Sequence, residues 1–94
     1  MASRGVARCV IPMGARVSGT ECEHAILIAL GSQIRSRRIE IGLSQEALAN
    51  LAGIDRSHMG KIERGERNVT ILNIERVAKV LECTPSSLLE NGGF

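Results

Sequence analysis

Hydrophobic side chains recur every three or four residues along most of this chain, which is the spacing of one face of an α-helix. The first such stretch runs from about Glu21 to Ile41, with Leu27, Leu30 and Ile34 on the same face as Ile41. The pattern therefore predicts one long amphipathic helix ahead of several shorter ones.

Polar residues and glycines mark where this first helix begins and ends. Thr20 and Glu23 have the T-x-x-E spacing of a capping box, so the helix is expected to begin near residue 21. Gly42 supplies its end. Gly31 lowers the helix propensity in the middle, so it marks either a bend or the point where a compact domain begins.

The stretch SQEALANLAGIDRSHMGKIERG, residues 44–65, reads as two short helices joined by a tight turn. Ser44 is a good N-cap for the first helix, and Gly53 can take the positive φ that ends it. Asp55 caps the second helix, in which Met59 and Ile62 form the apolar stripe. The opposite face of that second helix is polar and basic.

Two more helices follow. Thr70 is the N-cap of one that ends near Leu81, and Thr84 with Pro85 starts another that ends near Glu90. Their apolar positions are Ile74, Val77, Ala78, Leu81, Leu88 and Leu89. The chain is thus predicted to be all-α, with residues 91–94 as a frayed tail.

Composition agrees with a small helical domain. The 94 residues suffice for one domain, and aromatic residues make up only 1% of them, so the core must consist of Leu, Ile, Val and Ala. The net charge of +2 is too mild to indicate nucleic-acid binding by itself. Any such function has to be argued from the local pattern.

The cysteines and the N-terminal residues argue against several other classes of protein. Cys9, Cys22 and Cys83 are odd in number and lack CxxC spacing, which speaks against a disulfide framework. Cys22 and His24 lack a second ligand pair, so no metal or cofactor is expected. The chain shows no signal-peptide pattern and no apolar run long enough to span a membrane, so we expect a cytoplasmic protein.

Three blocks carry a family resemblance: LGSQIRSRRIEIGLSQEALANLAGI, then IERGERNVTILNIERVAKVL, then TPSSLL. Across residues 27–89 the chain resembles the lambda-repressor-like, or Cro/C1-type, helix-turn-helix domain. The resemblance implies five helices, with the second and third forming the helix-turn-helix. Its size resembles that of stand-alone regulators, including controller proteins of restriction–modification systems and small phage repressors.

The resemblance also implies which side chains would contact bases. Arg56, Ser57 and Lys61 match positions of the recognition helix that touch base edges, and His58 beside them is a possible DNA contact. Arginine can bond guanine O6 and N7 together, whereas serine can donate or accept. Lys61 could reach either guanine or a phosphate. This helix has no glutamine to read adenine, so no target sequence can be transferred.

Further residues match supporting roles of the family. Gln45 and Asn68 match contacts to DNA phosphates. Arg38 and Glu63 match a structural ion pair that ties the first helix to the recognition helix. Breaking one side of such a pair would leave a buried charge unpaired.

A single domain of this kind makes few DNA contacts, so tight binding usually needs two copies on half-sites roughly 34 Å apart. The resemblance implies a homodimer, with Ile71, Leu88 and Leu89 as interface candidates. The alternative is that these leucines only close the core of the monomer.

Residues 1–24 are predicted to be an N-terminal arm, residues 25–90 the DNA-binding domain and residues 91–94 the tail. The arm could be disordered, could follow DNA through its arginines (Arg4, Arg8 and Arg16), or could pair with a partner chain. Met13 is an alternative start of translation.

We expect a homodimeric regulator of transcription that binds a palindromic operator in double-stranded DNA. The alternative is an antitoxin that also holds a toxin partner, with the arm as its binding segment. The sequence argues against an enzyme: Gly60 and Gly65 have phosphate-loop spacing, but Glu66 and Arg67 stand where Lys and Ser or Thr are required.

Overall fold

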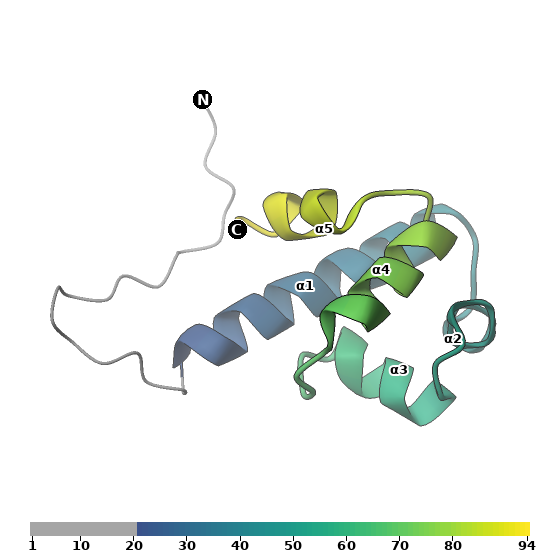
Figure 1. Cartoon of the computed structure of the whole chain (residues 1–94), viewed down its shortest axis with the longest axis horizontal. Helices are drawn as coiled ribbons and strands as arrows, with labels where there is room; N and C mark the ends of the chain where they lie inside the picture. The colour runs from purple at the N-terminus through teal and green to yellow at the C-terminus, as the bar shows by residue number, and fades with distance from the viewer. Residues whose placement is uncertain (1–20) are drawn as a thin grey trace, which may run out of the picture.

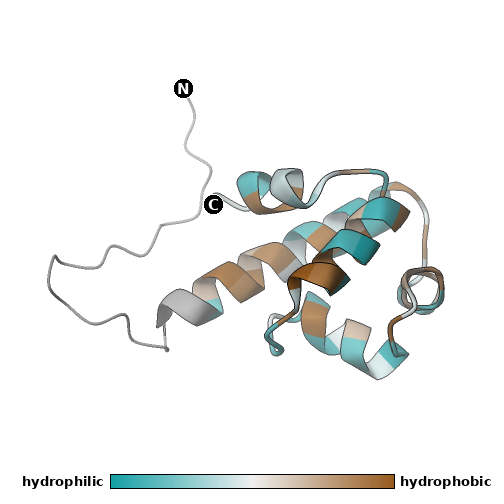
Figure 2. Ribbon diagram, in the orientation of Figure 1, coloured by the Kyte–Doolittle hydropathy of each residue, from teal (hydrophilic) through white to brown (hydrophobic). Residues whose placement is uncertain are grey.

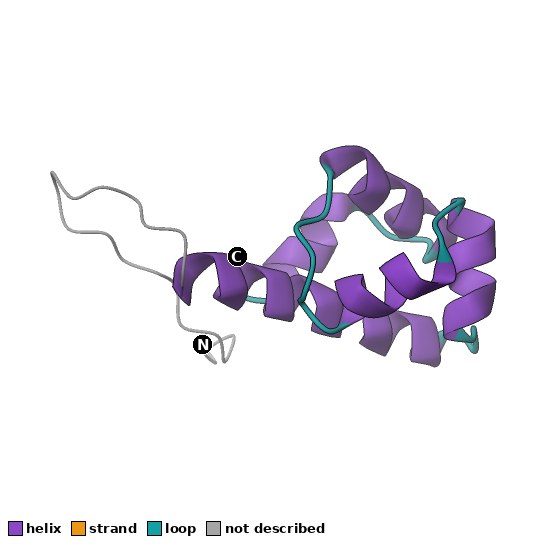
Figure 3. Ribbon diagram, turned by 90° about the horizontal axis from the view of Figure 1, so that it is seen from below, coloured by secondary structure: helices purple, strands orange, loops and turns teal. Residues whose placement is uncertain are grey.

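The computed structural model describes residues 21–94, and Figure 1 shows how its helices are arranged. In order they are α1 (Glu21–Glu40), α2 (Gln45–Ala52), α3 (Arg56–Glu63), α4 (Ile71–Val80) and α5 (Pro85–Asn91). Within the described part every regular element is a helix (Figure 3). The predicted all-α, five-helix fold is confirmed.

The expectations for the arm fall on residues that are largely outside this description. Residues 1–20, which include Cys9, Thr20 and the three arm arginines, lie outside it. The boundary predicted after residue 24 falls inside α1, which is continuous from Glu21.

Each of the four short helices begins at a polar N-cap, as the sequence predicted. The cap side chain accepts a hydrogen bond from a backbone N–H two or three residues further on, which satisfies a donor that the helix leaves free. The donor–acceptor distances are 3.0–3.1 Å, and the caps are Ser44, Asp55, Thr70 and Thr84.

Helix α1 is the long element against which the others assemble (Figure 1). It packs against α3 and α5, while α2 packs against α3 and α4, and α4 also contacts α5. The arrangement leaves α2 and α3 together at one end of the molecule, with one side of α3 turned away from the core.

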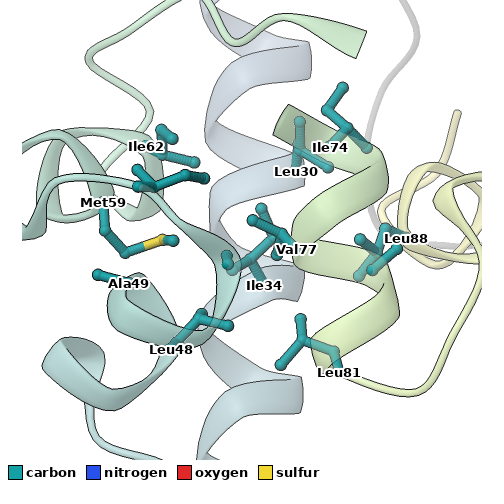
Figure 4. Packing of buried hydrophobic residues seen from close by; sticks show 13 residues of the cluster. Leu30, Ile34, Leu48, Ala49, Met59, Ile62, Ile74, Val77, Leu81 and Leu88 are labelled. Atoms are coloured by element: carbon teal, nitrogen blue, oxygen red, sulfur yellow. The ribbon is translucent and has the colours of Figure 1, made fainter. Parts of the chain in front are cut away.

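The core lies where the five helices meet, and Figure 4 shows its side chains converging from all of them. As predicted, it contains no aromatic ring. Burying a Leu, Ile, Val or Met side chain contributes about 1.5–3 kcal/mol. The most deeply buried large side chains are Ile34, Leu48, Met59, Val77 and Leu81.

Gly31 does not interrupt α1, which is continuous from Glu21 to Glu40. It is buried inside continuous α1, where a Cβ atom would lie 2.4 Å from the carbonyl oxygen of Ile62 and 2.6 Å from that of Glu63. The missing side chain lets α1 touch the backbone at the end of α3. Gly31 is therefore needed because the two helices approach closely.

The expectation of a frayed tail was wrong. Helix α5 extends to Asn91, Gly92 and Gly93 are buried, and the backbone N–H of Phe94 donates to the Leu89 carbonyl at 2.9 Å. A Cβ at Gly92 would lie 3.2 Å from the Ala29 side chain, so the tail packs against α1.

Candidate nucleic-acid interface

The turn between α2 and α3 fixes the angle between the two helices. Gly53 has φ +71°, a left-handed conformation that glycine adopts without steric strain. Ile54 follows it, is buried, and donates its N–H to the Ala49 carbonyl at 2.9 Å. Met59 and Ile62 then bury the inner side of α3. The other side of α3 must therefore face solvent.

That outer side forms an open hollow of about 550 Å³, which we call the α3 surface. Its lining residues are Gln45 from α2, the cap Asp55, and Arg56, Ser57, Gly60, Lys61 and Arg64. Three cationic side chains thus surround the hollow and one carboxylate borders it. Arg56, Ser57 and Lys61, the predicted base contacts, are all exposed there.

Gly60 lies at the floor of the α3 surface rather than on its exposed face. It is buried, and a Cβ there would lie 3.2 Å from Arg64 Nη1 and 3.4 Å from Gln45 Oε1. The absence of a side chain at Gly60 therefore leaves room for the ends of these two polar side chains. Arg64 also forms an exposed ion pair with Glu66, with Nε 3.0 Å from Oε2.

Asp55 is held in its ionised form by the first turn of α3. Its carboxylate accepts the Ser57 hydroxyl at 2.5 Å and the Ser57 backbone N–H at 3.1 Å. These bonds, led by the hydroxyl and followed by the backbone N–H groups of Ser57 and His58, hold the pKa of Asp55 below its ordinary value.

A partly buried polar cluster centred on Glu63 ties α3 to α1 and α2. Arg38 donates two hydrogen bonds to Glu63, from Nε to Oε2 at 2.7 Å and from Nη2 to Oε1 at 3.1 Å. Gln45 Nε2 donates to Glu63 Oε1 at 3.1 Å, and Arg38 Nη1 donates to the Leu43 carbonyl at 2.9 Å. The Glu63 side chain is only 2% exposed, so losing either partner would strand a buried charge.

Gln45 and His58, two of the predicted DNA contacts, have side-chain environments that the sequence did not indicate. One amide N–H of Gln45 is already bonded to Glu63, which leaves its second N–H for a phosphate. His58 Nε2 is buried with no protein hydrogen-bond partner, so this nitrogen does not face the α3 surface. Asn68 is exposed in the loop between α3 and α4, close in sequence to exposed Arg67.

The three interface candidates occupy different environments. Leu88 is 3% exposed and belongs to the monomer core, and Leu89 packs against that core. Ile71 is 67% exposed, and the adjacent Leu72 is 62% exposed. The first turn of α4 is accordingly among the strongly hydrophobic segments in Figure 2.

Asp55 and Arg64 line the α3 surface, but sequence reasoning did not select them as functional residues. Asp55 was assigned only its capping role. Arg64 follows Gly60 and Lys61 at helical spacing, so periodicity places it on the same face. That periodicity was the signal that could have identified it.

Among residues 21–94, no group of three or more His, Cys, Asp or Glu side chains is arranged to hold a metal ion. Over the same range no helix is long and apolar enough to cross a membrane.

The fold and the α3 surface define a helix-turn-helix protein, and comparisons with known proteins agree. A family model described as Helix-turn-helix matches residues 34–88. The control protein C.SmaI of Serratia marcescens is 41% identical over 73 residues, covering 78% of this chain and 87% of that protein.

Solved structures show the same fold. The restriction–modification controller protein C.AhdI from Aeromonas hydrophila has 47% identity and a TM-score of 0.64, covering 66% of this chain and 94% of its own. The biofilm regulator SinR, solved in complex with DNA, has 36% identity and a TM-score of 0.62, and the match covers 64% of this chain and 97% of the SinR chain. The chain belongs to the Cro/C1-type helix-turn-helix family and is a transcriptional regulator with a helix-turn-helix DNA-binding domain.

Proposed function

We propose that this protein acts as a homodimer that binds a palindromic operator in double-stranded DNA, in the manner of a controller of a restriction–modification system, in the cytoplasm. The observation that carries the proposal is the α3 surface, where Arg56, Lys61 and Arg64 surround an open hollow on a rigidly held helix. Guanidinium and ammonium groups in such a place can bond both base edges and phosphates.

The supporting contacts fit the same proposal. In it, Arg56, Ser57 and Lys61 read bases, while Gln45 and Asn68 hold phosphates on either side. The partly buried cluster of Arg38, Glu63 and Gln45 keeps α3 at a fixed angle, which direct base reading requires. Two control proteins and a DNA-bound regulator among the similar proteins support this choice.

The homodimer part rests on the exposed apolar side chains of Ile71 and Leu72. These two adjacent side chains are 67% and 62% exposed, so packing them against a second copy would remove apolar surface from water. Leu88 is buried within the monomer, so a dimer interface on α5 would use its neighbours instead.

Selection of bound sequences from random double-stranded DNA tests the proposal. The expected result is a palindrome whose two half-sites lie about one helical turn apart. The affinity for that palindrome should fall steeply as salt concentration rises, because binding releases counterions from the phosphates. Enrichment of no sequence, or an affinity independent of salt, would count against DNA as the ligand.

A further inference from the structure

The hydroxyl of Ser57 has a single proton, and the structure shows where that proton goes. Ser57 Oγ donates to Asp55 Oδ2 at 2.5 Å. The donor has to be the serine, because an ionised carboxylate has no proton to give. Ser57 is therefore left with its lone pairs for any further partner.

The pair of Ser57 and Asp55 thus presents only acceptors to the α3 surface. Both residues line the hollow and both are exposed. The neighbouring Arg56 and Lys61 have the opposite character, since guanidinium and ammonium groups carry donors only. The surface is consequently divided into a small acceptor patch and a larger donor patch.

Base edges in the major groove are divided in the same way. Adenine N6 and cytosine N4 carry amino donors, whereas adenine N7, guanine O6 and N7 and thymine O4 are acceptors. Every base pair therefore shows one amino group in the major groove, and the strand that carries it distinguishes A·T from T·A and C·G from G·C. An acceptor-only patch can bond the amino group and is repelled by the other edge.

We propose that Ser57, whose proton is held by Asp55, accepts a hydrogen bond from an exocyclic amino group of one base, adenine N6 or cytosine N4. It thereby selects, at one base pair, the orientation that places this amino group on the strand it contacts. This inference rests on the proposed DNA-binding function. Capping alone does not account for the pair, because the cap needs only the bond from the Ser57 backbone N–H to Asp55.

The chain supplies a matched control at another helix. Ser86 occupies the same place in α5 that Ser57 occupies in α3, two residues after the N-cap. Its Oγ lies 3.1 Å from Oγ1 of the cap Thr84, and it is absent from the lining of the α3 surface. Ser86→Ala thus removes an equivalent hydroxyl that the proposal gives no role in DNA reading.

The test compares sequences selected from random DNA by the wild type, Ser57→Ala and Ser86→Ala. The wild type should enrich A or C over G or T at one position of the half-site. Ser57→Ala should lose that preference by about tenfold while keeping the others, and Ser86→Ala should match the wild type. Asp55→Asn, which retains a capping side chain, should admit G or T at the same position because it adds a donor.

A base analogue identifies the chemical group directly. Purine in place of that adenine, or 2-pyrimidinone in place of that cytosine, removes only the amino group. The wild type should bind such a site about tenfold more weakly, and Ser57→Ala should bind it no more weakly than the natural site.

The outcomes separate the two proposals. If the wild type enriches no sequence, the proposed function fails and this inference fails with it. If the wild type enriches a palindrome but Ser57→Ala leaves every preference intact, or relaxes one for G or T, only this inference is overturned.

Discussion

At the scale of single residues, the proposal assigns base reading to Arg56 and a phosphate contact to Asn68. Arg56→Ala should weaken binding to the selected site by about 1–3 kcal/mol and relax the preference at one base pair, because arginine reads guanine through two bonds. Asn68→Ala should weaken binding to all sequences about equally. Titrations of each variant with the selected site and a scrambled site measure the difference, and an Arg56→Ala protein of unchanged affinity would refute the assignment of α3.

Asp55 gives the stability of the protein a dependence on pH. Its pKa in the folded protein lies below the ordinary value of 3.8, chiefly because of the Ser57 hydroxyl. The stabilisation is therefore fully present above pH 3.8 and is lost as the pH falls through the lowered pKa. Asp55→Asn should make the free energy of unfolding depend less on pH in this acidic range.

Urea unfolding of both proteins between acidic and neutral pH measures this effect. The two stability curves should converge as the pH decreases, since the wild type loses its advantage when Asp55 is protonated. Curves that stay parallel through the acidic range would show that Asp55 is not the group responsible.

At the scale of elements, the contact between α1 and α3 depends on Gly31. Alanine is the better helix former, so propensity alone predicts that Gly31→Ala stabilises the protein by about 1 kcal/mol. A Cβ only 2.4 Å from the Ile62 carbonyl oxygen must instead push the helices apart. We expect a net destabilisation of about 1–3 kcal/mol.

Denaturant unfolding checks the sign of this change. Ser32→Ala, at the next position of α1, is exposed and serves as a control expected to change stability little. A Gly31→Ala protein more stable than the wild type would show that α1 and α3 do not approach this closely.

The end of α4 carries a local strain that can be relieved. Glu82 has φ +58°, a left-handed conformation unfavourable for any residue with a Cβ. Glu82→Gly should therefore raise the free energy of unfolding by about 0.5–1 kcal/mol. Gly42→Ala tests the reverse change. Gly42 has φ +83°, and a Cβ there would have no heavy atom within 4 Å. Backbone strain alone should therefore lower the free energy of unfolding of this variant. Thermal melts of both variants should shift in opposite directions.

At the scale of the whole molecule, the first turn of α4 should hold two copies together. Ile71→Glu places a charge in that contact and should weaken dimerisation at least about tenfold, with a matching loss of affinity for the palindrome. Ile39→Glu replaces another exposed isoleucine, at the far end of α1, and should leave the dimer intact. Sedimentation velocity measures both, and an Ile71→Glu protein that stays dimeric would place the interface elsewhere.

Local signals in the sequence predicted the helices well, whereas most contacts between distant residues were beyond it. The ion pair of Arg38 with Glu63, 25 positions apart, was predicted only through the family resemblance. Caps such as Ser44 and Asp55 act on their own first turn, so a short window identifies them. The bond of Gln45 to Glu63 joins residues 18 positions apart, and the packing of Gly31 against α3 joins residues over 30 apart. Periodicity likewise placed Leu88 on an apolar face but could not show that this face is already covered.

The two sides of α3 have separate consequences for how such a regulator can change. Met59, Ile62 and Glu63 face inward and determine whether the protein folds, whereas Arg56, Ser57 and Lys61 face outward and add little to the core. Under the proposed function, substitutions of Arg56 and Lys61 should change the preferred operator with little effect on stability, whereas those of Ser57 also remove its bond to the cap Asp55. A lineage of regulators built this way could diverge in target while its scaffold stays unchanged.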